Sequence, residues 1–136
     1  MDNIRFLTVA DIIALHEIAM DMSDQPRAAL VREDALESAT HQAKNAAWYM
    51  GASAAEISVY LATHIALAHP WVDGNKRSAT MAGIQFALYN GASDPAPAAM
   101  ISFGDLLLKY IEADHDDRQS VFTEFVQFVE GWFGES

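Results

Sequence analysis

Nine consecutive residues, His69 to Arg77, combine more reactive side chains than any other stretch of this chain. His69 can act as a base, and Asp73 can bind a divalent cation. Lys76 and Arg77 carry positive charge within the same segment. A base, a metal-binding carboxylate and a cradle for anions are what phosphoryl transfer requires. This density of chemistry has no packing reason in a helical protein, so it indicates phosphate chemistry.

The chain should leave a helix just before these residues. Residues 56–68 place apolar side chains at spacings of three and four, which is typical of one buried helix face. Pro70 disfavours helical dihedral angles at His69, so the helix should end there. Gly74 can adopt the positive φ of a tight loop. A helix C-terminus favours a protonated imidazole, whereas a base must be neutral, so the working state of His69 stays open.

A second helix is predicted beyond the loop, over residues 76–89, with Asn75 as its N-cap. Free N–H groups and a partial positive charge make a helix N-terminus a binding site for anions. Lys76 and Arg77 in the first turn oppose that dipole, so they are poor choices for helix stability alone. They make sense if a polyanion binds there. Asp73 can then hold a divalent cation that bridges phosphates.

Each of these residues also has an ordinary structural explanation. His69 can be a helix-terminal histidine, Asp73 a turn residue, and the two cations a solvated first turn. Their joint occurrence at this spacing is harder to explain in that way, which favours a functional site.

The segment resembles the signature loop of the Fic/Doc superfamily, HxFx[D/E][G/A]N[G/K]R. Trp71 takes the aromatic position of that pattern. Lys76 stands where Fic adenylyltransferases carry a second glycine, and Thr80 stands where they carry a second arginine. Both differences resemble the Doc (death-on-curing) branch. Weaker likeness at residues 12–16 and 32–39, with the helices on either side of the loop, extends the resemblance over most of the chain up to about Gly91.

The resemblance implies a single domain over residues 1–136 with an all-α Fic fold, a helical bundle whose signature loop joins two central helices. By position, His69 would be the general base, Asp73 would hold Mg²⁺, and Trp71 would anchor the loop in the core. The residues that would bind the phosphates of ATP are Gly74, Asn75, Lys76 and Arg77. The two cations would also take part in catalysis.

Doc toxins transfer the γ-phosphoryl group of ATP to a threonine of elongation factor Tu, which halts translation. The resemblance therefore implies a protein kinase toxin. Lysine in the glycine position adds a charge and a side chain, which can change how the triphosphate lies and which phosphorus is attacked. The first alternative is AMP transfer of the Fic type. The second is a non-catalytic module that keeps the loop to bind nucleotide or a partner peptide.

Fic proteins are often inhibited by their own helix with an [S/T]xxxE[G/N] pattern. Neither residues 120–125 nor residues 126–131 fit that pattern. Inhibition is therefore expected in trans, from a small antitoxin encoded alongside.

The composition excludes several other classes of protein. A chain of 136 residues with 51% hydrophobic residues suits one domain with a real core. The absence of cysteine fits a reducing cytosol, and residues 1–22 lack the pattern of a signal peptide. No apolar run is long enough to span a membrane, so a cytoplasmic location is expected. The net charge of −11 argues against direct nucleic-acid binding.

The rest of the chain predicts helices around the central pair. They cover residues 9–22, 33–47, 104–112 and 120–133, with Thr8 or Asp11 near the start of the first and Ser102 capping the third. Residues 48–54 are a break and a candidate for the flap that positions target proteins in the superfamily. Residues 94–99 predict a loop because of their prolines.

Overall fold

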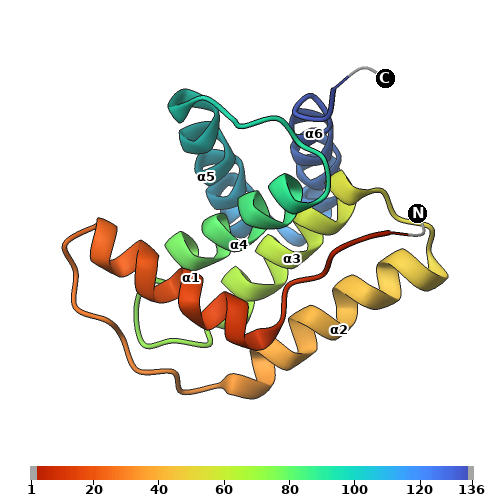
Figure 1. Cartoon of the computed structure of the whole chain (residues 1–136). Coiled ribbons are helices and arrows are strands. Elements are labelled where there is room, and N and C mark those ends of the chain that lie inside the picture. Colours follow the sequence, from red (N-terminus) through yellow and green to blue (C-terminus); the bar gives the residue numbers. More distant parts are fainter. Residues whose placement is uncertain (1–2, 135–136) are drawn as a thin grey trace.

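The structure is a computed structural model and describes residues 3–134. In this part of the chain six α-helices and one short 3₁₀ helix form an all-α fold, as the sequence predicts (Figure 1). The elements are α1 (Val9–Met22), α2 (Glu33–Tyr49), α3 (Ala54–Ala68), α4 (Asn75–Tyr89), α5 (Pro97–Glu112), η1 (His115–Asp117) and α6 (Arg118–Glu130).

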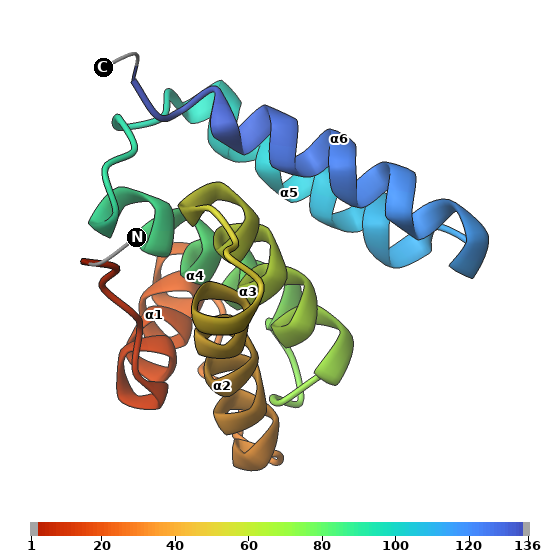
Figure 2. The same cartoon turned by 90° about the vertical axis from the view of Figure 1, so that its right-hand side faces the viewer.

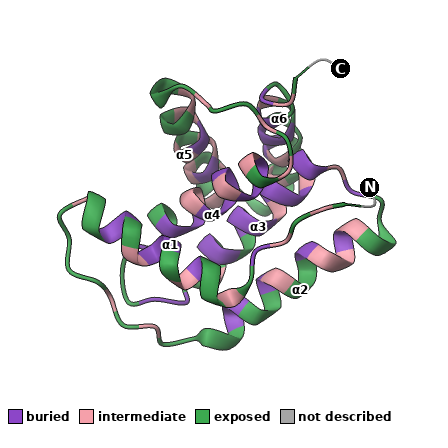
Figure 3. Ribbon diagram, viewed as in Figure 1, coloured by how far each residue is buried: buried purple, intermediate pink, exposed green. Residues whose placement is uncertain are grey.

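Helices α3 and α4 form the centre of the bundle, with the signature loop between them. They pack on each other more extensively than any other pair of helices. α2 covers α3 and α1 covers α4, while the α5–α6 hairpin lies across the opposite side (Figure 2). Buried residues are concentrated on α3 (Figure 3). The loop is therefore attached to the most buried elements of the molecule.

Small residues let the central helices approach closely. A Cβ at Gly83 of α4 would lie 3.1 Å from the Cβ of Ala62 on α3 and 2.6 Å from the ring of Phe103 on α5. The Ser58 hydroxyl donates a hydrogen bond of 2.8 Å to the Gly83 carbonyl. Gly83 is thus the point where three helices meet, which fixes the axis of α4 and the direction in which its N-terminus points.

Two of the helices begin with a capping box, in which the N-cap side chain and the third helical side chain satisfy each other's backbone N–H groups. Thr8 and Asp11 form this motif at α1, whose bounds agree with the prediction. Ser53 and Glu56 form it at α3, which begins two residues earlier than predicted.

The predicted break at residues 48–54 is present but shorter than predicted. Trp48 and Tyr49 belong to α2, and the break that remains lies at the N-terminal end of α3. The signature loop follows the C-terminal end of the same helix. The segment that lies against the loop is residues 28–32, which we call the strap.

The strap pairs with the loop through its backbone. The N–H groups of Val31 and Arg32 donate to the Pro70 carbonyl at 2.9 and 3.0 Å. The Val72 N–H donates to the Ala29 carbonyl at 3.1 Å. The strap therefore lies beside the loop, whereas the break between α2 and α3 lies at the opposite end of α3.

The start of α5 also differs from the prediction. α5 begins at Pro97, and Ser102 lies inside it instead of capping a helix from Gly104. Proline is favourable in the first turn of a helix, where its missing N–H would have had no partner. The prolines of residues 94–99 therefore mark a helix start as well as a loop. α6 runs two to three residues earlier than predicted, from Arg118 to Glu130.

None of the helices in residues 3–134 combines the length and the apolar character needed to cross a lipid bilayer.

Candidate active site

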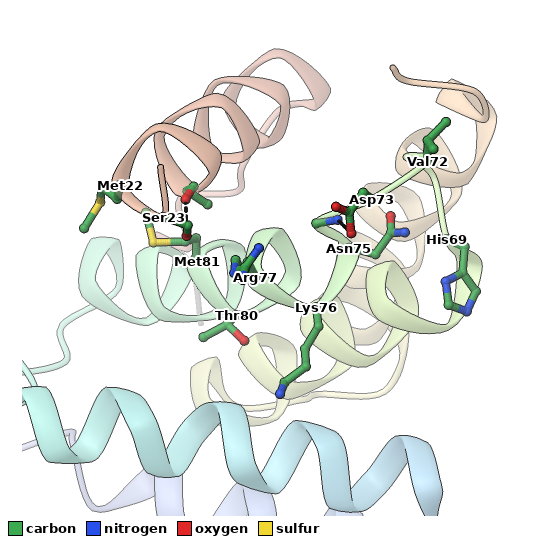
Figure 4. A pocket seen from close by; sticks show the side chains of 12 residues that line it. Met22, Ser23, His69, Val72, Asp73, Asn75, Lys76, Arg77, Thr80 and Met81 are labelled. Carbon is green, nitrogen blue, oxygen red and sulfur yellow. Dashed lines mark hydrogen bonds between the residues drawn. The ribbon is translucent and has the colours of Figure 1, made fainter. Parts of the chain in front are cut away.

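The loop between α3 and α4 and the C-terminal end of α1 border a pocket of about 660 Å³ (Figure 4). This volume lies within the range usual for small-molecule sites. The six predicted site residues all line it: His69, Asp73, Gly74, Asn75, Lys76 and Arg77. Further lining residues are Ala19, Met22, Ser23, Val72, Thr80 and Met81. The structure thus brings every predicted site residue to one concave surface.

The loop begins and ends with residues in the left-handed region. His69 ends α3 with φ 50° and ψ 60°, so the helix stops where Pro70 predicts. Gly74 has φ 80°, as expected for the turn into α4. A Cβ on Gly74 would lie 2.4 Å from Met20 Sδ and 3.2 Å from His16 Cε1. Only glycine allows the loop to pass this close to α1.

The prediction that Asn75 caps α4 is wrong, because Gly74 takes the N-cap position and Asn75 is the first helical residue. The Asn75 side chain turns back onto the loop instead. Its Oδ1 accepts from the Trp71 N–H at 2.9 Å, and its Nδ2 donates to the Trp71 carbonyl at 2.9 Å. This closed pair of hydrogen bonds fixes the shape of the loop. The side chain is therefore held in place by Trp71, while the Asn75 backbone N–H points out of the helix start.

The N-terminus of α4 keeps its donors free as a consequence. No side chain caps the helix. In the described part of the chain, the backbone N–H groups of Asn75, Lys76 and Arg77 have no acceptor, and the first helical bond runs from Ser78 to Gly74 at 2.9 Å. Such N–H groups, at the positive end of the helix dipole, bind anions.

Two cations beside these donors are not used by the fold. Six of the eight Lys and Arg side chains contact a carboxylate, a backbone carbonyl or an aromatic ring: Arg5, Arg27, Arg32, Lys44, Lys109 and Arg118. Within residues 3–134, Lys76 and Arg77 make no such contact. Figure 4 shows Arg77 directed toward the end of α1 and Lys76 directed away from it. The two uncommitted cations are thus the two in the pocket.

Among the described residues that line the pocket, Asp73 is the only acidic one. Its Oδ1 accepts from the Gly74 N–H at 2.8 Å, and the side chain is otherwise exposed. Residues 3–134 contain no group of three or more His, Cys, Asp or Glu side chains arranged to hold a metal ion. Mg²⁺ commonly binds through one or two carboxylates, with phosphates and water completing its shell. The single carboxylate therefore fits Mg²⁺ that arrives with a nucleotide.

The strap also contacts the end of α3 just before His69. Arg32 Nη1 donates to the Ala68 carbonyl at 2.9 Å. This bond satisfies a carbonyl at the C-terminus of α3 and sets a positive charge beside the residue that precedes His69. The His69 side chain itself is exposed. It is therefore free to meet a substrate from solvent.

Trp71 anchors the loop in the core, as predicted, because its side chain is only 2% exposed. Its ring stacks on His16 of α1, with centroids 4.2 Å apart and planes 4° from parallel. His16 Nδ1 lies 2.7 Å from the Ser78 hydroxyl oxygen. Burial lowers the pKa of His16, while the Ala28 backbone and the charges of Glu17 and Asp73 oppose that shift.

Sequence reasoning missed His16 and the contribution of α1 to the pocket. One signal was present, because His16 shares a helix face with Ile12 and Met20, four residues before and after it. A histidine on an apolar stripe must have a partner when it is buried. That partner, Ser78, comes from α4 and cannot be located without the fold.

A family model described as Fic/DOC family matches residues 6–87. The match covers more than half of the chain and ends within α4, so α5 and α6 lie beyond it. Comparisons with curated proteins and with solved structures give no significant match.

Proposed function

The chain belongs to the Fic/DOC family, whose members transfer nucleotide or phosphate groups to proteins, and we propose that it is a protein kinase of the Doc branch. It transfers the γ-phosphoryl group of Mg-ATP to a protein hydroxyl. As a toxin of a toxin–antitoxin pair it inhibits translation, with elongation factor Tu as its target.

The arrangement of positive charge in the pocket carries this proposal. Lys76 adds an uncommitted cation at the start of α4, in the place of a glycine in the adenylyltransferases. Thr80 lines the same pocket where those enzymes have an arginine. One cation is thus gained at the helix N-terminus and one is lost a turn further along. Phosphoryl transfer depends on positioning and charge. This redistribution therefore favours a triphosphate orientation different from that in the adenylyltransferases, with attack on the γ-phosphorus.

His69 is the general base of the proposed reaction. Its imidazole accepts the proton of the target hydroxyl while the hydroxyl oxygen forms a bond to the γ-phosphorus. The bond from that phosphorus to the bridging oxygen breaks, and ADP leaves with the electron pair. Arg32 steadies the end of α3 from which His69 projects, through its hydrogen bond to the Ala68 carbonyl.

The phosphates are held by backbone and side chains together. Lys76 and Arg77 bind phosphate oxygens and stabilise the negative charge that moves toward ADP. Gly74 and Asn75 contribute the loop shape and their backbone, since the Asn75 side chain is bonded to Trp71. Asp73 is the residue that would hold Mg²⁺, which when bound would neutralise part of the phosphate charge.

Apolar side chains at the mouth of the pocket support a protein partner. Met22 is 77% exposed, Val72 is 70% exposed and Val31 is 59% exposed. Met22 and Val72 line the pocket, and Val31 belongs to the strap, which pairs with the loop. Exposed apolar groups beside a polar site are typical of protein docking. We assign this rim to the target protein, and to a small antitoxin that blocks it in trans.

The decisive experiment measures the mass added to a target protein. The purified chain is incubated with Mg-ATP and elongation factor Tu, and intact mass is recorded. A phosphate-sized increment is expected, lost in His69→Ala and kept in His41→Ala, which changes an exposed histidine on α2. Loss of a general base should slow transfer by about 10²–10⁴-fold.

Two outcomes would replace the proposal. An AMP-sized increment would make the chain an adenylyltransferase. Equal growth arrest by cells that express the wild type and cells that express His69→Ala would indicate a non-catalytic binding module.

A further inference from the structure

The buried face of the signature loop packs against His16 of α1, a histidine that takes no direct part in the proposed chemistry. His16 is 2% exposed and contacts the loop at Trp71 by stacking at 4.2 Å. It contacts the first turn of α4 at Ser78, with 2.7 Å from Nδ1 to Oγ. Its Cε1 lies 3.2 Å from the position of the Cβ that Gly74 lacks. A single ring therefore touches the beginning of the loop, its end and the helix that follows.

These contacts are more than an apolar core needs. An imidazole costs free energy to bury unless its nitrogens are bonded, and a phenylalanine or leucine would fill the space without that cost. Ser78 is fully buried as well, and its N–H closes the first turn of α4 on the Gly74 carbonyl at 2.9 Å. The polar pair thus joins α1 to the residue that defines where α4 begins.

The two ring nitrogens of His16 have different surroundings. Nδ1 shares a hydrogen bond with the Ser78 hydroxyl, and which of the two groups donates depends on the tautomer. Nε2 is buried and makes no hydrogen bond. Through Nδ1 and its stacked face, the ring connects the loop to α4.

We propose that His16 is a positioning residue, which holds the signature loop and the first turn of α4 in the geometry that presents free N–H groups and Lys76 to the phosphates. It does so by stacking on Trp71 and through its hydrogen bond with the Ser78 hydroxyl. The part of this inference that concerns transfer rests on the proposed function, whereas the part that concerns loop order does not.

Four variants separate the contacts of the ring. His16→Phe keeps a ring against Trp71 and removes both nitrogens. His16→Asn places its amide near the position of Nδ1, whereas His16→Gln places it nearer that of Nε2. Ser78→Ala removes the partner hydroxyl with the smallest change in volume, so it remains informative if a His16 variant folds poorly. The control is His41→Gln on the exposed side of α2.

The first measurement is hydrogen exchange of the backbone over residues 69–78, which requires no activity. Exchange should become roughly tenfold faster in His16→Phe, His16→Gln and Ser78→Ala, as expected for losing one buried hydrogen bond. His16→Asn should restore most of the protection, and residues 118–130 of α6 should not change. Unchanged exchange over residues 69–78 in Ser78→Ala and His16→Phe would overturn the proposal.

The second measurement is the kinetics of transfer. kcat/KM for Mg-ATP should fall roughly tenfold per folded molecule in Ser78→Ala and His16→Gln, and the double variant should be no worse than either single one. A lower melting temperature with kcat and KM unchanged would assign His16 a structural role only. If the wild type transfers nothing, the proposed function fails, and hydrogen exchange still decides the role of His16.

Discussion

Helices α3 and α4 have the same length, 15 residues each, and pack side by side, but they begin in opposite ways. α3 begins with Ser53, whose side chain accepts from the Glu56 N–H at 3.1 Å while the Glu56 carboxylate accepts from the Ser53 N–H at 2.9 Å. α4 begins with Gly74 in the left-handed region and no capping side chain. Its first turn holds two cations, where α3 has an acid.

The difference separates stability from binding. A capping box satisfies the free N–H groups of a helix and an acid complements its dipole, so the start of α3 is stable by itself. The start of α4 has neither a capping side chain nor an acid in its first turn, so a bound anion would have to satisfy its N–H groups and complement its dipole. What holds it in place comes from elsewhere, through the Asn75–Trp71 bonds and the contacts of His16. The proposed phosphate site is thus built at the expense of local helix stability.

The largest effect is expected from filling the two glycines that precede these helices. Gly51 and Gly74 have φ values of 65° and 80°. A Cβ on Gly51 would meet nothing within 4 Å, whereas a Cβ on Gly74 would meet buried Met20. Gly51→Ala should cost about 1 kcal/mol of unfolding free energy for backbone strain alone. Gly74→Ala should cost about 2–4 kcal/mol, because overpacking adds to that strain.

Urea unfolding of both variants measures the two costs. Gly74→Ala should also lose Mg-ATP binding, which calorimetry detects, while Gly51→Ala keeps it. Equal costs for the two variants would mean that Met20 moves aside freely and that Gly74 is required only for its φ.

Lowering the pH should reduce the unfolding free energy through protonation of His16, which contacts the start of α4. Burial lowers the pKa of His16 in the folded protein below its ordinary value, so the unfolded chain binds a proton first as the pH falls. The stabilising effect of the neutral ring is complete above about pH 6.5 and is lost below it, by at most about 1.4 kcal/mol per pH unit. Urea unfolding between about pH 5 and 8 measures the slope. His16→Asn should flatten this part of the profile, and a slope unchanged in that variant would assign the acid sensitivity to other groups.

Removing the cap of α3 should have a smaller effect, and one confined to stability. Ser53→Ala leaves the Glu56 N–H without its acceptor and should cost about 1 kcal/mol of unfolding free energy. Chemical denaturation measures this loss. Affinity for Mg-ATP should not change, since the cap lies at the other end of α3 from the pocket. A weaker affinity in this variant would show that the two helix starts are coupled.

The parts of the fold that follow local rules were predictable from the sequence. The bounds of α1 follow from Thr8 and the apolar spacing after it, and the end of α3 follows from Pro70. The left-handed turn at Gly74 follows from the freedom of glycine. The grouping of His69, Asp73 and Arg77 in one pocket follows from their closeness in sequence.

The parts decided by contacts that leave no signal in the local sequence pattern were not predictable. Asn75 is a good N-cap by type, but its side chain bonds Trp71 across the loop, so Gly74 caps the helix. The strap lies against the loop through backbone hydrogen bonds, which leave no mark on side-chain periodicity. The partner of His16 is 62 residues away. The pairing of strap and loop and the His16–Ser78 bond both join segments that are far apart in the sequence.

The smallest effect on stability is expected from a substitution of Lys76, which also tests most directly the contrast between the starts of α3 and α4. Lys76→Glu gives the first turn of α4 the acid that Glu56 gives α3, and should raise the unfolding free energy by about 0.3–1 kcal/mol through the helix dipole. The same change removes an uncommitted cation from the pocket and should abolish Mg-ATP binding.

Urea unfolding and calorimetry on one preparation measure both quantities, with Lys76→Gln as an intermediate. The mirror variant, Glu56→Lys, should lose stability and keep nucleotide affinity. Opposite signs for stability and binding at position 76 are what a helix start arranged for phosphate requires. A Lys76→Glu variant that loses stability would show instead that Lys76 already has a structural role there, and the contrast between the two helices would no longer explain the site.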